Sequence, residues 1–504
     1  MELIITIDIG TTAVRIIAFD LEGNSKGYKK GAYPTFHAQP DSSEQDPEQV
    51  FITVLFMLKG LLNELFSDPK NRVVAIVFSS SMHSVLPIDK TGTPLGNAII
   101  WADNRSKKVA DEIKNSDMGP KIYEATGTPI HAMSPLSKIT WIHKQQPERF
   151  AKVYKFISIK EYVIYQFTNE YVIDFSLASA TGMFNIKQCK WEQQALDIAG
   201  ITSNYLSDPS TIYHDGCKIN PELAKSLRLS RNTKIIIGST DGCMATIGSG
   251  IFGDGQATLS LTSSGAVRVL GVEQIHDKKQ RLFNYILDEN HIISGGPTNN
   301  GGVVLDWYAR QFGSFKSGID FDETMFDIFN EALHVSPGAN GLIFLPYLLG
   351  ERAPIWDSNA RGSYFGINIR HEPKHFARAT IEGIIFELMS ISKVLENYRS
   401  IKELSLTGTI ETLPLWSEMI TDIFGLKVRV HHGVKNINLG SALVGLTQLG
   451  VFENIESAVK SIKPSEVLVP NTSNHRLYQK YFKLFIRLTQ KLKSEFKLLS
   501  ELEN

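Results

Sequence analysis

The first twenty residues constrain the fold more than any other stretch of this chain. A β-branched run at residues 4–9 is followed by the short turn 10–12 and a second apolar run at Ala13–Asp20. The first run is typical of a buried strand, and two such runs across a glycine-containing turn predict a β-hairpin. Strand and helix patterns then alternate through both halves of the chain, which predicts an α/β fold.

The turn of this hairpin has the composition of a phosphate site. Gly10, Thr11 and Thr12 offer backbone N–H groups and two hydroxyls, and Asp8 lies two residues before the glycine. Converging N–H groups suit phosphate oxygens, whereas a nearby acid repels them unless a divalent cation lies between. The combination suggests a nucleotide phosphate with Mg²⁺. An ordinary hairpin with a polar turn is the alternative.

Composition excludes several classes of protein. The 504 residues are too many for one hydrophobic core, and 42% hydrophobic with 21% charged residues is typical of a globular protein. A net charge of −1 argues against a nucleic-acid binder. The three cysteines are widely spaced, so neither a disulfide framework nor a CxxC metal site is expected. Without a leader pattern or a long apolar run, the cytoplasm is the expected location.

A second hairpin pattern lies about half a chain length after the first. Residues 257–270 read as strand, hydroxyl-rich turn and strand, and Ala266-Val267-Arg268 repeats the order of Ala13-Val14-Arg15. The repeat predicts two domains of like topology, residues 1–247 and 248–504, each presenting a phosphate hairpin to one interdomain cleft. Further strands are expected at 72–78, 234–237, 342–346, 404–407 and 427–430. Helices are expected from residue 47 and at 133–145, 160–167, 303–312, 373–396 and 415–424, and from residues 439 and 476.

Polar residues cluster after two of the expected strands in the first half. Residues 79–84 follow the strand at 72–78, where open α/β sheets usually bind ligands. His83 in this stretch is either a ligand contact or a histidine satisfied by local hydrogen bonds. Trp101, Asp103 and Arg105 together suit a polyol, because a ring packs on C–H faces while the charged groups bind hydroxyls. A surface ion pair beside a core tryptophan is the alternative.

Two further positions invite a chemical role. Asp241, framed by small residues after the strand at 234–237, is a candidate general base, and a helix cap is the alternative. Residues 299–302 precede the expected helix 303–312, whose bare N-terminus is expected to bind an anion.

Three familiar motifs do not carry their usual meaning here. Residues 248–253 fit GxGxxG but lead into a turn rather than a helix, so a dinucleotide site is not expected. Residues 371–375 fit HExxH, but Pro373 between the histidines is better placed at a helix start. The chain has no GxxxxGK[ST] motif, so a P-loop is excluded.

Two long patterns resemble the signatures of the FGGY carbohydrate kinases, which have the actin/Hsp70/sugar-kinase (ribonuclease H-like) fold. Residues 133–145 fit the first signature at each specified position, and residues 362–382 fit the second with the correct spacing. The resemblance runs from about residue 4 to residue 449. It implies a two-domain α/β kinase with a cleft between its domains, with MgATP and a small sugar or sugar acid as its partners.

Within this family the chain is most similar to gluconate kinases. The similarity lies in residues 78–85, 101–106, 127–133, 159–162 and 174–180. Met82-His83 argues against a glycerol kinase, although xylulose kinases share it. The resemblance therefore implies ATP-dependent phosphorylation of D-gluconate, with xylulose or another sugar as the alternative substrate. The residues also leave open a non-enzymatic actin-like protein and a regulatory relative with a decayed ATP site.

The resemblance also implies roles for individual residues. Asp241 is the expected base, and Asp8 with Asp241 is expected to hold Mg²⁺. The β- and γ-phosphates of ATP are expected beside Thr11, Thr12, Ser263, Ser264 and Gly265. The nucleotide is expected to be bordered by Gly301, Gly302, Gly408 and Thr409. The sugar pocket is expected to contain Met82, His83, Trp101, Asp103, Met133 and Gly242, with Arg105 in support.

The chain departs from the family pattern at two nucleotide-site positions. Thr262 and Thr409 stand where family members usually have glycine. Because glycine lets a phosphate or base approach the backbone closely, both departures bear on ATP affinity. The sequence does not choose among Arg105, Lys138, Lys160 and His131 for the gluconate carboxylate. It also leaves the oligomeric state open, and a homodimer is compatible with it.

Overall fold

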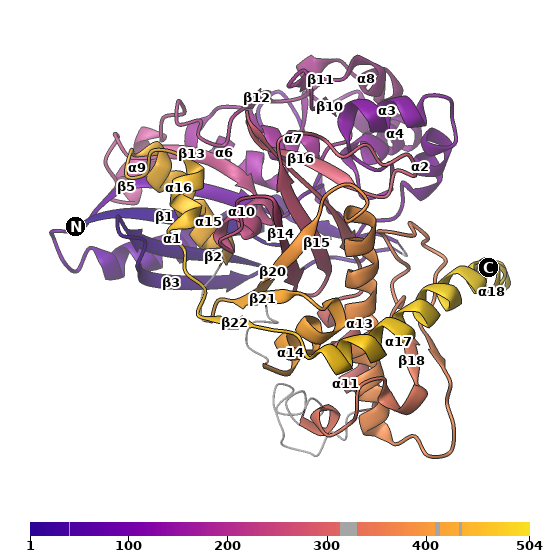
Figure 1. The fold of residues 1–504 in the computed structure, drawn as a ribbon. Helices are drawn as coiled ribbons and strands as arrows, with labels where there is room; N and C mark the ends of the chain where they lie inside the picture. The colour runs from indigo at the N-terminus through magenta and orange to yellow at the C-terminus, as the bar shows by residue number, and fades with distance from the viewer. Residues whose placement is uncertain (40, 313–329, 409–413, 433–435, 504) are drawn as a thin grey trace. The chain divides into compact units, whose positions relative to one another are not determined.

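The chain forms two compact units whose segments alternate along the sequence (Figure 1). The computed structural model describes residues 1–39, 41–312, 330–408, 414–432 and 436–503. Unit 1 comprises Met1–Gly248, Gly271–Ser294 and Lys435–Ile462, and unit 2 comprises Ser249–Leu270, Gly295–Val434 and Lys463–Asn504. The division of the sequence at residue 247 stays a prediction about domains, while the compact units draw two later segments into unit 1.

Unit 1 is built on a five-stranded sheet with the order β13-β5-β1-β2-β3. Its strands are β1 (Glu2–Ile9), β2 (Ala13–Asp20), β3 (Ser25–Ala32), β5 (Arg72–Ser80) and β13 (Lys234–Thr240). The predicted hairpin is confirmed, because β1 and β2 pair antiparallel and place Asp8 opposite Arg15. Strands β1, β5 and β13 run parallel, so their carboxyl ends lie at one edge of the sheet.

The β-branched strands of this sheet are buried because helices of unit 1 pack on them. Helix α1 (Pro47–Leu65) begins where the sequence predicts, with the Asp46 side chain accepting from the N–H groups of Glu48 and Gln49. The other helices of unit 1 are α2 (Lys107–Lys114), α3 (Gly119–Thr126), α4 (Pro135–Gln145), α5 (Pro147–Phe150), α6 (Ile159–Thr168), α7 (Phe175–Ser179), α8 (Gln193–Ala199), α9 (Pro221–Ser226), α10 (Asp241–Gly248), α15 (Asn436–Gln448) and α16 (Ile455–Lys460). Its short strands are β4 (Glu44–Gln45), β6 (Leu86–Ile88), β7 (Ala98–Ile99), β8 (Lys155–Ile157), β9 (Val172–Asp174), β10 (Phe184–Asn185), β11 (Lys190–Trp191), β12 (Asp208–Ser210) and β16 (Phe283–Asp288).

The segment Gly271–Ser294 belongs to unit 1 through specific hydrogen bonds. The Tyr123 hydroxyl donates to the carbonyl of Leu282 at 2.7 Å, and the Asn284 N–H donates to the carbonyl of Gly127 at 2.8 Å. These bonds join residues more than 150 positions apart in the sequence. They bring Tyr285 into unit 1.

Helix α15 joins unit 1 through close backbone contact with α10 (Figure 1). A Cβ at Gly440 would lie 2.1 Å from the carbonyl oxygen of Met244, and a Cβ at Gly248 would lie 1.9 Å from that of Asn436. The small residues predicted to allow close packing in this helix are therefore used in that way. The helix begins at Asn436, three residues before the predicted start.

Unit 2 contains most of a seven-stranded sheet with the order β16-β17-β15-β14-β20-β21-β22. Its strands are β14 (Gly255–Leu261), β15 (Gly265–Gly271), β17 (His291–Thr298), β18 (Ile343–Leu345), β19 (Ser363–Phe365), β20 (Ile401–Gly408), β21 (Lys427–Val430) and β22 (Glu466–Leu468), and its helices are α11 (Gly302–Phe312), α13 (Pro373–Leu395), α14 (Pro414–Phe424), α17 (Thr472–Lys491) and α18 (Lys493–Glu503). The second predicted hairpin is confirmed by the antiparallel pairing of β14 with β15.

Helix α13, almost wholly buried, is the centre of unit 2 and packs against α17 (Figure 1). Arg378 and Glu382 of α13 form a buried ion pair of 2.8 Å, and Tyr478 of α17 hydrogen-bonds to both. The C-terminal helical region therefore covers the body, as predicted, although it begins at Thr472 and continues into α18. Within the described ranges, no helix combines the length and apolar character that crossing a bilayer requires.

Replacement of glycine by alanine is expected to have opposite effects on stability at two helical positions, Gly440 in α15 and Gly60 in α1. Gly440→Ala places a methyl group against the backbone of α10 and is expected to lower the free energy of unfolding by about 1–3 kcal/mol. Gly60→Ala in α1, where a Cβ would approach only Lys29 Cε at 3.8 Å, is expected to raise it by about 1 kcal/mol. Urea denaturation of both variants measures the two effects. Equal or same-sign changes would contradict the packing.

Candidate active site

Asp8 is a buried carboxylate at the end of β1. Its side chain is 1% exposed, with Arg15 Nη1 at 3.3 Å from Oδ2 and the Ser79 hydroxyl donating to Oδ1 at 3.3 Å. Burial raises the pKa of Asp8 to about 7, Arg15 opposes this rise, and the negative charge of Asp241 adds to it. The two acids therefore share a region of unit 1 in which their charges are not fully compensated.

The turn between β1 and β2 is held by its carbonyl groups. The Tyr33 hydroxyl donates to the carbonyl of Gly10, Gln45 Nε2 donates to that of Thr11, and the Tyr33 N–H donates to that of Thr12 at 3.2 Å. All three turn carbonyls are thus occupied by donors of unit 1. Their partial negative charges are satisfied within the protein, which favours an anion over a cation at the turn.

The second hairpin turn is held in the same way. The N–H of Gly302 donates to the carbonyl of Thr262 at 2.7 Å, that of Val303 to Ser263 at 3.1 Å, and that of Thr262 to Ser264 at 2.8 Å. Again the three turn carbonyls are occupied by donors of the same unit. The prediction of a bare N-terminus on α11 is therefore wrong, because its first N–H groups bind the hairpin.

The glycines before α11 allow this contact. A Cβ at Gly301 would lie 2.5 Å from the carbonyl carbon of Ser264, and one at Gly302 would lie 2.7 Å from the Thr262 oxygen. A side chain at either position would push the helix off the turn. In the structure, these two glycines support the hairpin that carries Ser263, Ser264 and Gly265.

The two hairpins share one side-chain contact but differ in charge. Arg15 reaches back across the first hairpin to Asp8, and Arg268 reaches back across the second to the Ser260 hydroxyl at 2.7 Å. In each unit the arginine of the repeated Ala-Val-Arg order therefore bonds across its own hairpin. Arg15 bonds to the residue opposite it, whereas Arg268 bonds to Ser260, two positions from the residue opposite it. Only the first hairpin has a carboxylate at this place, so the acid that could meet a cation belongs to unit 1.

Thr262 is accommodated without backbone strain. Its side chain is exposed, and it is absent from the residues with positive φ. Its methyl group would be 3.1 Å from a Cβ on Gly408, whose φ of 98° and closeness to the Leu261 carbonyl require glycine. The Thr262 methyl group therefore occupies part of the space on the side of Gly408 where a side chain would lie. Thr409 lies outside the described residues.

Asp241 follows β13 and is the first residue of α10. Its Oδ1 accepts from the N–H of Gly242 at 2.6 Å, and its side chain is half-buried. Near its carboxyl end, β13 departs from regular pairing with β5 around Gly238. Gly238 has a φ of 62°, and a Cβ there would lie 1.9 Å from the carbonyl oxygen of Phe78. A carboxylate at a helix N-terminus both favours the helix and stays available for proton transfer, so the two interpretations of Asp241 are compatible.

His83 is held in a defined orientation. Its φ of 71° is unusual for a residue other than glycine. Nδ1 lies 2.8 Å from the carbonyl oxygen of Ala180, and since a carbonyl only accepts, Nδ1 carries a proton. Nε2 lies 3.5 Å from the Tyr285 hydroxyl. Of the neighbouring predicted residues, Met82 is partly buried and Met133 is 1% exposed.

The tryptophan and the ion pair of residues 101–105 have different surroundings. Trp101 Nε1 donates to the Thr11 hydroxyl at 3.1 Å, which links the predicted sugar residues to the first hairpin turn. The Asp103 carboxylate, 2% exposed, accepts from Arg105 Nη2 at 2.7 Å and from the Ser43 N–H at 2.8 Å. Asp103 is buried and Arg105 is partly exposed, so the pair lies at the edge of the interior rather than fully on the surface.

Two of the four candidates to bind the substrate carboxylate are buried lysines whose ammonium groups bind other groups of the protein. Lys138 Nζ donates to the carbonyls of His83 and Ile100 at 2.6 and 2.8 Å, and Lys160 Nζ donates to Asp174 at 2.7 Å. Both side chains are buried. Arg105 also pairs with Asp103 and Glu44, but its side chain is partly exposed, so it stays a candidate together with His131. The Met133 N–H donates to His131 Nδ1 at 3.1 Å, which leaves the His131 proton on Nε2.

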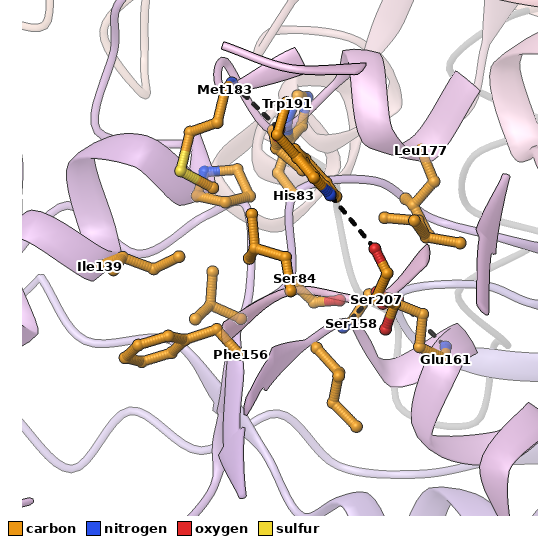
Figure 2. Close-up of a pocket in the computed structure, with 16 residues that line it drawn as sticks. His83, Ser84, Ile139, Phe156, Ser158, Glu161, Leu177, Met183, Trp191 and Ser207 are labelled. Atoms are coloured by element: carbon orange, nitrogen blue, oxygen red, sulfur yellow. Dashed lines mark hydrogen bonds between the residues drawn. The ribbon is translucent and has the colours of Figure 1, made fainter. Parts of the chain in front are cut away.

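A small enclosed cavity lies beneath His83, and Figure 2 shows its lining. Its volume of about 20 Å³ holds a water molecule but not a sugar acid. Burial raises the pKa of Glu161 in its wall to about 7, and the Trp191 indole donates to the Ser207 carbonyl at 3.2 Å. Of the predicted site residues, only His83 lines this cavity. The cavity is therefore a packing void of unit 1 and not the sugar pocket.

Several residues that shape this region carry no signal in the sequence. Tyr33, Gln45 and Tyr285 have no motif, and the side chain of each hydrogen-bonds to a residue distant in the chain. The pattern of small and hydroxyl residues located the turns themselves. The donors that hold them became visible only with the fold.

Comparisons with known proteins agree with this organisation. Residues 3–248 match the N-terminal domain of the FGGY family of carbohydrate kinases, and residues 262–449 match the C-terminal domain. The chain is 36% identical to the gluconokinase of Bacillus subtilis (strain 168), covering 98% of this chain and 97% of that protein.

Two solved structures share the fold over nearly the whole chain. The gluconate kinase from Lactobacillus acidophilus has a TM-score of 0.91 with 32% identity, covering 99% of both chains. The ligand-bound xylulose kinase from the same species has a TM-score of 0.92, also with 32% identity, covering 99% of this chain and 100% of that chain. The two hairpins, the strand-end acids and these matches lead to one conclusion. The chain belongs to the FGGY family of carbohydrate kinases and has its two-domain α/β fold.

Proposed function

We propose that this chain transfers the γ-phosphoryl group of ATP to the C6 hydroxyl of D-gluconate, giving 6-phospho-D-gluconate and ADP. The observation that carries the substrate is the 36% identity to a gluconokinase over nearly both full lengths. The xylulose kinase of known structure is 32% identical, so xylulose is the second candidate substrate. The gluconate-kinase-like stretches at 78–85, 101–106 and 127–133 favour the sugar acid.

Asp241 is the proposed base. Its carboxylate takes the proton of the attacking hydroxyl as that oxygen forms its bond to the γ-phosphorus, and the bond from phosphorus to the β–γ bridging oxygen breaks to release ADP. The proton then passes to solvent. The position of Asp241 at a strand end, half-buried and close to Asp8, supports this role.

The hairpin turns are the proposed phosphate contacts. Thr11 and Thr12 in unit 1, and Ser263, Ser264 and Gly265 in unit 2, combine hydroxyls and N–H groups with carbonyls that are already occupied. Gly301, Gly302 and Gly408 support the second turn and border the nucleotide. Thr409 is proposed beside them from the sequence alone.

Asp8 and Asp241 are the proposed magnesium ligands. Among the described residues, no group of three or more His, Cys, Asp or Glu side chains is arranged around a common metal position. Mg²⁺ in kinases is held by one or two carboxylates together with phosphate oxygens and water. Burial and the charge of Asp241 raise the pKa of Asp8 although Arg15 opposes this, which supports a cation beside the two acids. Mg²⁺ held by these two carboxylates would neutralise charge on the phosphates.

The proposed sugar contacts surround the end of β5. His83 and Met82 follow that strand, while Trp101 lies beside Thr11 and Met133 precedes α4. Asp103 and Arg105 support the Trp101 loop through their ion pair, in which Asp103 is buried, and Gly242 adjoins the base. Arg105 and His131 are the two candidates for the substrate carboxylate.

The substrate assignment predicts a clear preference in a panel of sugars. ADP release is measured with D-gluconate, D-xylulose, D-ribulose and glycerol at equal concentration with MgATP. D-gluconate is expected to give the highest kcat/KM, because the substrate stretches match gluconate kinases. Strong turnover of xylulose with none of gluconate would overturn the substrate while leaving the kinase reaction intact.

Removal of the base predicts a loss of turnover without a loss of sugar binding. Asp241→Asn is expected to lower kcat at least about 100-fold, because general-base help of this size is lost. The Kd for gluconate, measured by calorimetry, is expected to stay close to that of the unaltered protein. Asp254→Asn, on an exposed turn, serves as the control. Near-normal turnover of Asp241→Asn would remove it as the base.

The buried charge of Asp8 predicts that function and stability oppose each other. Its folded pKa is about 7 against an ordinary value of 3.8, so the folded state loses stability as pH rises from about 4 through 7. Asp8→Asn is therefore expected to raise Tm at pH 8, with a smaller difference at pH 5, while activity is lost. Thermal unfolding at both pH values measures this.

Asp20→Asn is the matched control with the opposite sign. Burial raises the pKa of Asp20, but hydrogen bonds from Lys26 and Asn24 outweigh burial and lower it. The Asp20 substitution is expected to lower Tm at pH 8, where the paired carboxylate stabilises the fold. A lower Tm for Asp8→Asn at pH 8 would contradict the assignment of Asp8 as a buried charge that Arg15 compensates only in part.

A further inference from the structure

The strand end that precedes Asp241 rests on a buried ion pair. Lys160 of α6 and Asp174 at the end of β9 both have side chains that are 0% exposed, and Nζ lies 2.7 Å from Oδ2. Lys160 Nζ also donates to the carbonyl of Ser239 at 3.1 Å. The lysine therefore ties an acid of one element to the backbone of β13, two residues before Asp241.

Ser176 extends this network to the residue adjoining Asp241. Its hydroxyl donates to Asp174 Oδ1 at 2.6 Å and lies 2.6 Å from the hydroxyl of Ser239. The same oxygen accepts from the N–H of Thr240 at 3.0 Å. Both residues before Asp241 are thus held by groups of the network.

The position of these bonds is explained by the shape of β13. The pairing of β13 with β5 shifts register between Ile236 and Ser239, around Gly238. Pairing resumes at Ser239 opposite Ser79 and at Thr240 opposite Ser80, so the network binds the two residues that follow the irregularity. A buried ion pair seldom adds net stability compared with apolar residues, because desolvation opposes its attraction. Its place here, directly behind Asp241, points to a geometric task.

A second buried lysine makes similar bonds behind the proposed sugar pocket. Lys138 of α4 is 1% exposed and bonds to the carbonyls of His83 and Ile100 at 2.6 and 2.8 Å. The first carbonyl belongs to His83 itself, and the second belongs to Ile100, the residue before Trp101. Burial lowers the pKa of Lys138 to about 7, while the charge of Asp103 opposes this change. The positive φ of His83 needs such an external hold.

We propose that the two buried lysines are positioning residues with separate tasks in this kinase. Lys160, through Asp174 and Ser176, fixes the strand end that aims Asp241 at the sugar hydroxyl. Lys138 fixes the two loops that carry His83 and Trp101 and so shapes the sugar pocket. This inference rests on the proposed function of Asp241 and of the sugar residues.

The two tasks predict that loss of each lysine affects a different kinetic constant. Lys160→Met is expected to lower kcat about 10- to 100-fold with KM for gluconate changed no more than about twofold, because a misplaced base slows only the chemical step. Lys138→Met is expected to raise KM for gluconate about tenfold or more with a smaller change in kcat. Steady-state kinetics with saturating MgATP measures both constants.

Further variants separate positioning from folding. Ser176→Ala keeps the Lys160–Asp174 pair but removes its link to Thr240, and it is expected to lower kcat together with a modest fall in Tm. In the double variant Lys160→Met with Asp174→Asn, neither member of the pair is charged, and the Asn oxygen still accepts from Leu177 and Ser176. Tm is therefore expected to recover toward that of the unaltered protein while kcat stays low. Lys234→Ala, at the exposed start of the same strand, is the control with unchanged kinetics.

Each outcome decides the proposal. Recovery of both Tm and kcat in the double variant, or normal kcat in Ser176→Ala, would show a structural role only and overturn it. Equal effects of the two lysine variants on kcat and KM would overturn the separation of tasks. If Asp241→Asn keeps its turnover, the proposed function fails first. If that variant is inactive while Lys160→Met and Ser176→Ala keep full kcat, only this inference fails.

Discussion

The carbonyl groups of the two hairpin turns are the constraint on which the site depends. In each turn, three consecutive carbonyl oxygens accept hydrogen bonds from donors of the same unit. A turn is by nature a mixture of donors and acceptors, and an anion meets repulsion from any carbonyl left unpaired. Once the carbonyl oxygens accept hydrogen bonds from the protein, the hydroxyls and N–H groups of the turn determine its electrostatic preference. The first turn uses side chains of Tyr33 and Gln45, whereas the second uses the first N–H groups of α11.

Buried charge is the second theme of unit 1. Asp8, Lys138, Lys160 and Asp174 are all nearly inaccessible, and each lies at or behind a strand end. Such groups cost free energy to bury, so a fold selected for stability alone would replace them with apolar residues. Asp8 bonds to Arg15 of the first hairpin, Lys138 bonds to the carbonyls of His83 and Ile100, and Lys160 bonds to Asp174 and to the Ser239 carbonyl. Their partners thus lie in the hairpin, loops and strand end next to the proposed site residues. Unit 2 has its own buried pair, Arg378 with Glu382, which joins α13 to the C-terminal helix α17.

Much of the architecture followed from local patterns. The β-branched runs predicted β1, β2 and β5, Asp46 predicted the start of α1, and the repeated Ala-Val-Arg order predicted the second hairpin. Hydroxyl-rich stretches also located the turns of the two hairpins, because the residues of a turn are adjacent in the sequence. The prediction for α11 failed for the opposite reason. Whether a helix N-terminus is free depends on what packs against it, and Thr262 and Ser263 occupy it from another part of the chain.

The sequence by itself determined the order of the elements, the two hairpins and the family signatures, since each rests on residues near one another in the chain. Only the tertiary structure decided which donors hold the turns, that Gly271–Ser294 and the α15 region fold with unit 1, and that Lys138 and Lys160 face backbone carbonyls and an acid rather than substrate. A lysine in a sequence can bind an anion or support a strand end. The choice depends on burial and on partners distant in the sequence, which spacing along the chain cannot specify.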